Sequence, residues 1–248
     1  MPSEIITGYI EIDGLRAYKA SPTAAAGDRP ATGMLVLPMV TGIGEQVREW
    51  TDTIARSTGN VALAWDTWHG RSSDDTGFDD LRVLSQQLED DVALQEQDRL
   101  LRHMREELGL TSIGVVGWCL GGRYALILGG RNRSLVNVIA FHPTVTMGET
   151  AEAVDAVAHA GMIEAPVFMA YPGKDSIVPR ESFLALQQAL QSRHQAPSII
   201  QLYPEAKHGF SDKRRHNEAV NESAYRLSWP QALEFMKATT GHPGPGAE

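Results

Sequence analysis

The only cysteine of the chain lies in a setting typical of a catalytic nucleophile. Cys119 occurs in Gly-Trp-Cys-Leu-Gly, after an apolar run and before a stretch of small and apolar residues. This matches the pattern G-x-nucleophile-x-G, in which a sharp turn between a strand and a helix exposes the reactive side chain. The N–H groups at the start of such a helix favour the thiolate, which is the reactive form. The competing interpretation is a small buried cysteine within glycine-rich packing of strand and helix.

An acid and a histidine follow in the order that a catalytic triad requires. Asp175 comes directly after the apolar run 167–171, and His208 follows the run 199–204. Nucleophile, acid and histidine occur in this order in α/β-hydrolases. Alone, Asp175 could as well form a turn or cap a helix, and His208 could be a surface loop residue. Their joint placement after successive strands favours a triad, in which the amide of Leu120 would be one oxyanion donor.

The segments that would position these residues alternate between strands and helices. Aspartate and glycine at 13–14 predict a hairpin near the start of the chain. Further strands are predicted at 34–40, 61–66, 113–118, 136–143, 167–171 and 198–204, with helices near 45–57, 120–130, 149–160, 180–194 and 217–239. A long charged stretch over 79–108 is predicted to be helical, either continuous or broken. This alternation predicts an α/β fold, with a mostly parallel sheet, helices on both faces and a site at the carboxyl ends of the strands.

One uninterrupted alternation also predicts one domain over residues 1–248. We expect its core at about 8–238 and a frayed tail at 241–248. Charged residues make up 21% of the chain, and the net charge is −9. The negative charge argues against a nucleic acid or an anionic membrane as partner. A single cysteine cannot form an internal disulfide, and no signal peptide is apparent, so we expect a cytoplasmic protein, monomeric or homodimeric.

Three motifs of the chain resemble those of the dienelactone hydrolase family, which has the α/β-hydrolase fold. They are the nucleophile turn "GWCLGG", the acid loop "GKDSIVP" and the histidine loop "YPEAKHGF". The resemblance spans about residues 8–238. It implies hydrolysis of a lactone or small carboxylic ester through an acyl-cysteine, without metal or organic cofactor, with Cys119, Asp175 and His208 as triad. It also places a second oxyanion donor at the amide of Val40.

One departure from the family concerns a residue near the predicted nucleophile. Members often carry a glutamate, thought to help generate the thiolate, where this chain has Met39 in "PMVTG". A methionine cannot take up a proton, so the substrate need not be a dienelactone. Two alternatives therefore stay open: an acyl transferase using the same triad, and a non-catalytic binder of small molecules.

Several residues near predicted strand ends are candidates for binding substrate. Met39, Trp68, His69 and Trp118 could line a pocket that combines aromatic and polar groups, and Arg82 could hold a substrate carboxylate. Other candidates have equally plausible structural or surface roles; they are Trp65, Asp66, Arg71, His142, Asp212, Arg214 and Arg215. No Cys/His spacing typical of zinc and no phosphate-binding loop occurs in the sequence.

Overall fold

The computed structural model describes residues 4–23, 32–146 and 153–241, in which eight strands form one sheet. The sheet order is β1-β2-β4-β3-β5-β6-β7-β8. The strands are β1 (Ile5–Ile12), β2 (Leu15–Pro22), β3 (Thr32–Leu37), β4 (Val61–Trp65), β5 (Ser112–Trp118), β6 (Leu135–Phe141), β7 (Val167–Pro172) and β8 (Ser198–Tyr203). β3 to β8 run parallel, and the β1–β2 hairpin joins β4 through an antiparallel pairing. The predicted hairpin and mostly parallel sheet are thus confirmed.

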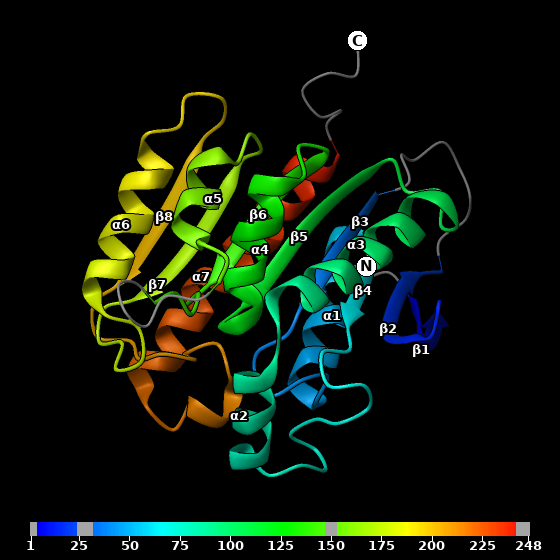
Figure 1. Ribbon diagram of the computed structural model, residues 1–248, viewed down its shortest axis with the longest axis horizontal. Coiled ribbons are helices and arrows are strands. Elements are labelled where there is room, and N and C mark those ends of the chain that lie inside the picture. The colour runs from blue at the N-terminus through cyan, green and yellow to red at the C-terminus, as the bar shows by residue number, and fades with distance from the viewer. Residues whose placement is uncertain (1–3, 24–31, 147–152, 242–248) are drawn as a thin grey trace.

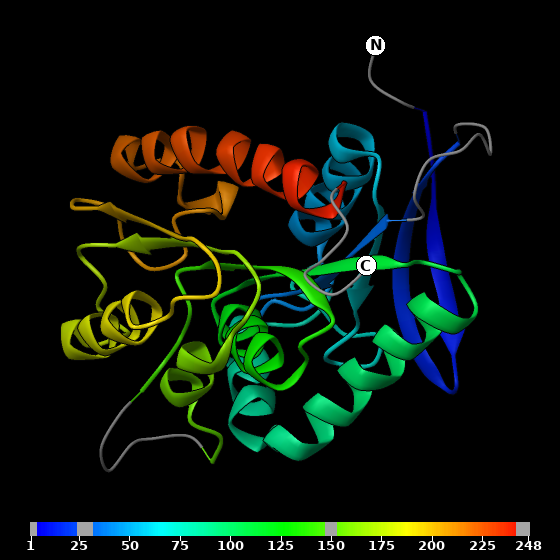
Figure 2. The same cartoon turned by 90° about the horizontal axis from the view of Figure 1, so that it is seen from above.

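Helices cover both faces of this sheet (Figure 1). The helices are α1 (Glu45–Thr58), α2 (Phe78–Gln87), α3 (Asp90–Glu106), α4 (Leu120–Arg131), α5 (Ala156–Met162), α6 (Arg180–Gln191) and α7 (Ala219–Thr240), with a short 3-10 helix, η2 (Lys213–Arg215). Figure 2 shows α1 and α7 on one side of the sheet and α3 to α6 on the other. This three-layer arrangement buries the central strands on both faces.

The alternation of side chains along β3 shows how two cores arise from one strand. Leu35 and Leu37 pack into the core beneath α3 to α6. Met34 and Val36 point to the opposite face and join the core beneath α1 and α7. Both faces of the strand are apolar, because successive side chains of a strand point to opposite sides of the sheet.

Two helical predictions are refined by the structure. The stretch 79–108 is a broken helix and not a continuous one: it forms α2 and α3, because the chain is extended at Leu88 and Glu89. The helix predicted at 149–160 begins only at Ala156, where Asp155 accepts hydrogen bonds from two amides of the first turn. Residues 147–152, and the predicted tail beyond Gly241, lie outside the described residues. No helix in the described ranges is long and apolar enough to cross a membrane.

Candidate active site

The turn that carries Cys119 connects the central strand β5 to α4. Cys119 has φ 54° and ψ −115°, a conformation that side-chain-bearing residues rarely adopt. Glycines make the turn possible. A Cβ atom on Gly117 would lie 2.0 Å from the carbonyl oxygen of Gly121, and one on Gly121 would lie 2.1 Å from that of Leu37. The backbone therefore approaches itself closely on both sides of the cysteine, as the glycine pattern predicts.

The structure brings the three residues of the predicted triad into one hydrogen-bonded chain. The Sγ atom of Cys119 lies 3.1 Å from Nε2 of His208, and Nδ1 of His208 lies 2.7 Å from Oδ2 of Asp175. The other carboxylate oxygen of Asp175 accepts hydrogen bonds from the amides of Ile177 and Val178, at 2.8 and 2.9 Å. The side chains of His208 and Asp175 are almost fully buried. The carboxylate is therefore held in place by its own loop and holds the imidazole in turn.

The electrostatics of this arrangement favour a thiolate–imidazolium pair. Burial raises the pKa of the Cys119 thiol, but the charge of His208 and hydrogen bonds from His208, Thr144 and the Leu120 amide outweigh burial and lower the pKa below its ordinary value. Burial lowers the pKa of His208, whereas Cys119 and Asp175 raise it, to about 10. Each partner thus stabilises the charged form of the other.

Sequence reasoning did not identify Thr144, which also contacts the reacting atoms. Its hydroxyl lies 3.0 Å from Sγ of Cys119 and 3.5 Å from Nε2 of His208. Its amide donates to the carbonyl oxygen of Cys119, at 3.0 Å. The available signal was position, because Thr144 lies just beyond β6, at the same end of the sheet as the cysteine. A hydroxyl here can donate to a thiolate and help to stabilise it.

The rival histidine, His142, lies behind His208 rather than beside the thiol. The two rings meet edge to face with their centroids 5.2 Å apart. Nε2 of His142 lies 3.1 Å from the hydroxyl of Ser211. Burial is the main cause that lowers the pKa of His142, and the charge of His208 adds to it. A neutral ring in this place supports the orientation of His208 and does not compete with it for the thiol proton.

A cavity of about 520 Å³ opens above Cys119 and His208. This volume suits a small molecule. Met39 and Val40 line it, as the sequence predicts for these two positions. Its other lining residues are Thr41, Phe78, Ile177, Gly209, Asp212, Arg214, Arg215, Asn217 and Glu218. Among the lining residues, Phe78 and Ile177 were not identified from the sequence. Phe78 begins α2 without a recognisable motif, and Ile177 lies in the acid loop, where only Asp175 stood out.

The two tryptophans predicted to bind substrate have other roles. Trp118 is completely buried, and its ring stacks on Trp50 with the centroids 4.2 Å apart. It is the last residue of β5, and its side chain lies in the core beneath α1 and α7. Trp68 donates from Nε1 to the carbonyl oxygen of Val40, at 2.7 Å. It supports the loop that carries a predicted oxyanion donor, and it does not line the cavity above Cys119.

The polar candidates His69 and Arg82 also lie outside that cavity. Nε2 of His69 lies 3.2 Å from a carboxylate oxygen of the buried Glu96. Arg82 is exposed on α2 and lies 3.7 Å from Asp79 one helical turn away. Both side chains are engaged on the surface by neighbouring carboxylates, so a substrate-binding role for them is not supported.

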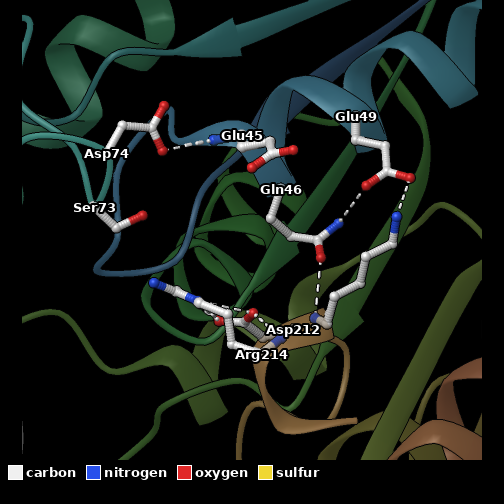
Figure 3. Close-up of a pocket in the computed structure, with 8 residues that line it drawn as sticks. Glu45, Gln46, Glu49, Ser73, Asp74, Asp212 and Arg214 are labelled. Atoms are coloured by element: carbon white, nitrogen blue, oxygen red, sulfur yellow. Dashed lines mark hydrogen bonds and ion pairs between the residues drawn. The ribbon is translucent and has the colours of Figure 1, made fainter.

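Arg214 and Arg215, which follow the histidine loop, line the cavity, but Arg214 is already paired with a carboxylate. Arg214 donates to both carboxylate oxygens of Asp212, at 2.6 to 3.1 Å. Figure 3 shows this pair beside a hollow next to the cavity, where Gln46 of α1 accepts a hydrogen bond from the amide of Lys213, at 3.0 Å. Lys213 also forms an ion pair with Glu49. Helix α1 thereby fixes η2, and with it one wall of the cavity.

A mostly parallel sheet with a strand–turn–helix nucleophile elbow defines the α/β-hydrolase fold. The family model described as "Dienelactone hydrolase family" matches residues 15–240. The chain belongs to the dienelactone hydrolase family. The predicted fold, the predicted family and the assignment as a hydrolase are thereby confirmed.

Individual proteins agree with this assignment. The chain is 26% identical to "Putative carboxymethylenebutenolidase" of Escherichia coli (strain K12), over 96% of this chain and 89% of that protein. It is 25% identical to "Carboxymethylenebutenolidase" of Rhodococcus opacus, over 88% of this chain and 84% of that protein. A crystal structure of "Putative Dienelactone Hydrolase" from Klebsiella pneumoniae subsp. pneumoniae superposes with a TM-score of 0.79 at 23% identity, covering 94% of this chain and 98% of the other. The last likeness concerns the fold.

Proposed function

We propose that the protein hydrolyses a small carboxylic ester or lactone with Cys119 as nucleophile. The observation that carries this proposal is the hydrogen-bonded chain from Sγ of Cys119 through His208 to Asp175, with steps of 3.1 and 2.7 Å. The names of the two bacterial relatives, which describe carboxymethylenebutenolidases, support the same chemistry. The reaction needs no metal or organic cofactor, because thiolate, imidazolium and water supply every reacting group.

In the first half-reaction the Cys119 thiolate attacks the carbonyl carbon and forms a tetrahedral intermediate. The carbon–oxygen bond to the alcohol then breaks, and Nε2 of His208 gives its proton to the leaving oxygen. The product is an acyl-cysteine thioester. In a lactone the alcohol stays attached to the acyl group. Asp175 orients the imidazole and stabilises its cationic form, as the acid of a triad does.

In the second half-reaction water attacks the thioester. His208, now neutral, takes a proton from the water as its oxygen bonds to the carbonyl carbon. The second tetrahedral intermediate expels the Cys119 thiolate and releases the acid. This step restores the thiolate–imidazolium pair. An acyl transferase would differ only in the acceptor, because an alcohol or amine would replace water.

We assign the oxyanion to the backbone amides of Leu120 and Val40. Leu120 is the first residue of α4, where N–H groups lack partners within the helix. Val40 lines the same cavity from the end of the loop after β3, and its carbonyl group is held by Trp68. One well-aimed donor contributes about 3 kcal/mol to stabilising the transition state. The fixed backbone on both sides of Cys119 supports this assignment.

The identity of residue 39 bears on which lactone is the substrate. Met39 is buried at the wall of the cavity, where family members often have a glutamate. We propose that thiolate formation rests on His208, Thr144 and the helix start alone. We therefore expect that dienelactone is not the preferred substrate, because position 39 has no carboxylate to help generate the thiolate.

Substitution of the nucleophile tests the proposed function. Cys119→Ala should remove nearly all turnover of p-nitrophenyl acetate and of a lactone panel while leaving the melting temperature near that of the wild type. Mass spectrometry of an acid-quenched reaction should find the acyl group on Cys119. Undiminished turnover by Cys119→Ala, or an adduct on another residue, would contradict the mechanism. Bound ligand without turnover by the wild type would favour the binding role.

Three further expectations stay predictions. The single sheet formed by the described residues supports one domain over residues 1–248. The lone cysteine supports a cytoplasmic location. Monomer and homodimer are both compatible with the fold, and sedimentation would distinguish them.

A further inference from the structure

We infer that the substrate is a neutral ester or lactone with an apolar substituent, which packs against Phe78 and Ile177. This inference rests on the proposed function, because it concerns the cavity above Cys119. It goes further in naming the chemical class of the substrate. The two residues are called the apolar rim below.

The apolar rim consists of large side chains that the fold leaves exposed at the cavity. Phe78 is 58% exposed and Ile177 is 53% exposed, and both line the cavity above Cys119 and His208. Phe78 is the first residue of α2, and α2 lies in the lower part of the molecule in Figure 1. Ile177 is tied to the acid loop, since its amide donates to Asp175 at 2.8 Å. Exposed apolar groups beside a pocket mark a surface that gains free energy when a ligand covers it.

The deeper wall of the cavity is also uncharged. Met39 is 4% exposed, and Val40 and Thr41 follow it in the same wall. With the apolar rim, these residues make up an uncharged part of the lining around the thiol. A substituent of a bound ester can therefore be partly removed from water here.

Apart from the reacting residues, three of the four charged lining residues are already paired with an opposite charge. Among them are two acidic residues, Asp212 and Glu218, and two arginines, Arg214 and Arg215. Arg214 is bound to Asp212, and Glu218 forms an ion pair with Lys207 outside the cavity.

Arg215 is the exception within this wall. It is exposed and forms no ion pair with any residue that the structure describes. Because Arg215 is exposed, salt in the solvent screens its attraction for an anion. It is nevertheless the residue that would bind an anionic substrate if the inference is wrong.

Burial of a substituent predicts how activity depends on chain length. A fully buried methylene group would raise kcat/KM about fourfold. Because the apolar rim is partly exposed to water, we expect kcat/KM to rise only about twofold per methylene group. A carboxylate at the end of the same chain would lose its hydration, and kcat/KM should fall by on the order of tenfold.

The experiment measures kcat/KM for two series of neutral esters, p-nitrophenyl alkanoates from acetate to hexanoate and alkyl acetates from ethyl to hexyl. The wild type should show the rise per methylene in at least one series. Phe78→Ser and Ile177→Ser should flatten that rise, mainly through KM. Leu227→Ser is the matched control, because Leu227 is 56% exposed on α7 and does not line the cavity. It should keep the wild-type slope.

A charge comparison completes the test. Ethyl butanoate should be preferred over monoethyl succinate, and Ile177→Lys should reverse or reduce this preference. A wild-type slope near zero in both series, unchanged slopes in both rim variants, or a preference for the succinate ester that Arg215→Met removes would overturn the inference. Each comparison is a ratio within one variant. Failure of the proposed function appears separately, as turnover that survives Cys119→Ala.

Discussion

Replacing Asp175 by asparagine isolates the charge that holds the imidazolium. The side-chain oxygen of the asparagine can still accept the amides of Ile177 and Val178, which bind Oδ1 of Asp175 at 2.8 and 2.9 Å. The amide NH₂ then faces Nδ1 of His208, where the carboxylate oxygen lies 2.7 Å away in the native protein. Because the asparagine NH₂ donates to Nδ1, the imidazole must carry its proton on Nε2. Nε2 can then accept a proton from the thiol or from water only if the hydrogen bond between the asparagine and Nδ1 is lost.

The size of the effect follows from the lost charge. Two unit charges about 4 Å apart interact by about 4 kcal/mol at an effective dielectric constant of about 20. This corresponds to about 3 pH units in the pKa of His208, which is about 10 in the native protein. The equilibrium between thiol–imidazole and thiolate–imidazolium shifts by about a thousandfold. We therefore expect kcat/KM of Asp175→Asn to fall about a thousandfold.

The assay is the pH dependence of Cys119 alkylation by iodoacetamide, followed by mass spectrometry, together with ester hydrolysis. A thiol with a lowered pKa and an imidazole with a raised pKa coexist as an ion pair between the two pKa values. The native protein should therefore react below pH about 8.5, the ordinary thiol pKa. The reactivity of Asp175→Asn should rise only at higher pH.

A matched control separates charge from loop structure. The carboxylate of Asp155 accepts hydrogen bonds from the amides of Val157 and Ala158, at 2.9 and 3.0 Å, and among the described residues the only histidine contact of Asp155 is that of His159 with its backbone carbonyl oxygen. Asp155→Asn should keep both the alkylation profile and kcat/KM. If Asp175→Asn shows the native profile and loses less than about tenfold in activity, the assigned role of the carboxylate is wrong.

Two further predictions concern the turn and the residue beside it. Gly121→Ala should unfold the protein or lower its melting temperature strongly, because a Cβ atom would lie 2.1 Å from the backbone oxygen of Leu37, whereas Gly8→Ala, with nothing within 4 Å, should melt near the native temperature. Met39→Glu should raise dienelactone turnover relative to other esters in a steady-state assay. Efficient dienelactone hydrolysis by the native protein would show instead that Cys119 needs no such carboxylate.

The positions of the predicted reacting residues could be predicted from the sequence because local rules determine them. Cys119 had to lie at a turn, since glycines flank it where strand and helix approach closely. Asp175 and His208 each follow a strand, and parallel strands bring their carboxyl ends to one edge of the sheet. The strands themselves are long apolar runs, which need two covered faces. These signals need only short stretches of sequence.

The binding residues were predicted less well, because a residue's distance from a strand end does not say which way it points. Trp118 is adjacent to Cys119 in sequence, yet its ring is buried in the core beneath α1 and α7, stacked on Trp50. Trp68 donates a hydrogen bond to the backbone carbonyl oxygen of Val40 and does not line the cavity. Side-chain direction changes with each step along a strand or turn, so the face of the sheet must be known first.

The cavity wall depends on contacts between residues far apart in the chain. Short sequence motifs therefore do not reveal most of it. Gln46 of α1 holds the amide of Lys213, 167 positions further on. The adjacent Arg214 then pairs with Asp212, so that neither is free to attract an opposite charge. The triad can therefore stay the same while the wall changes through substitutions in α1, α2 or η2. If the proposed function is correct, we expect specificity to depend mainly on wall residues that no sequence motif marks.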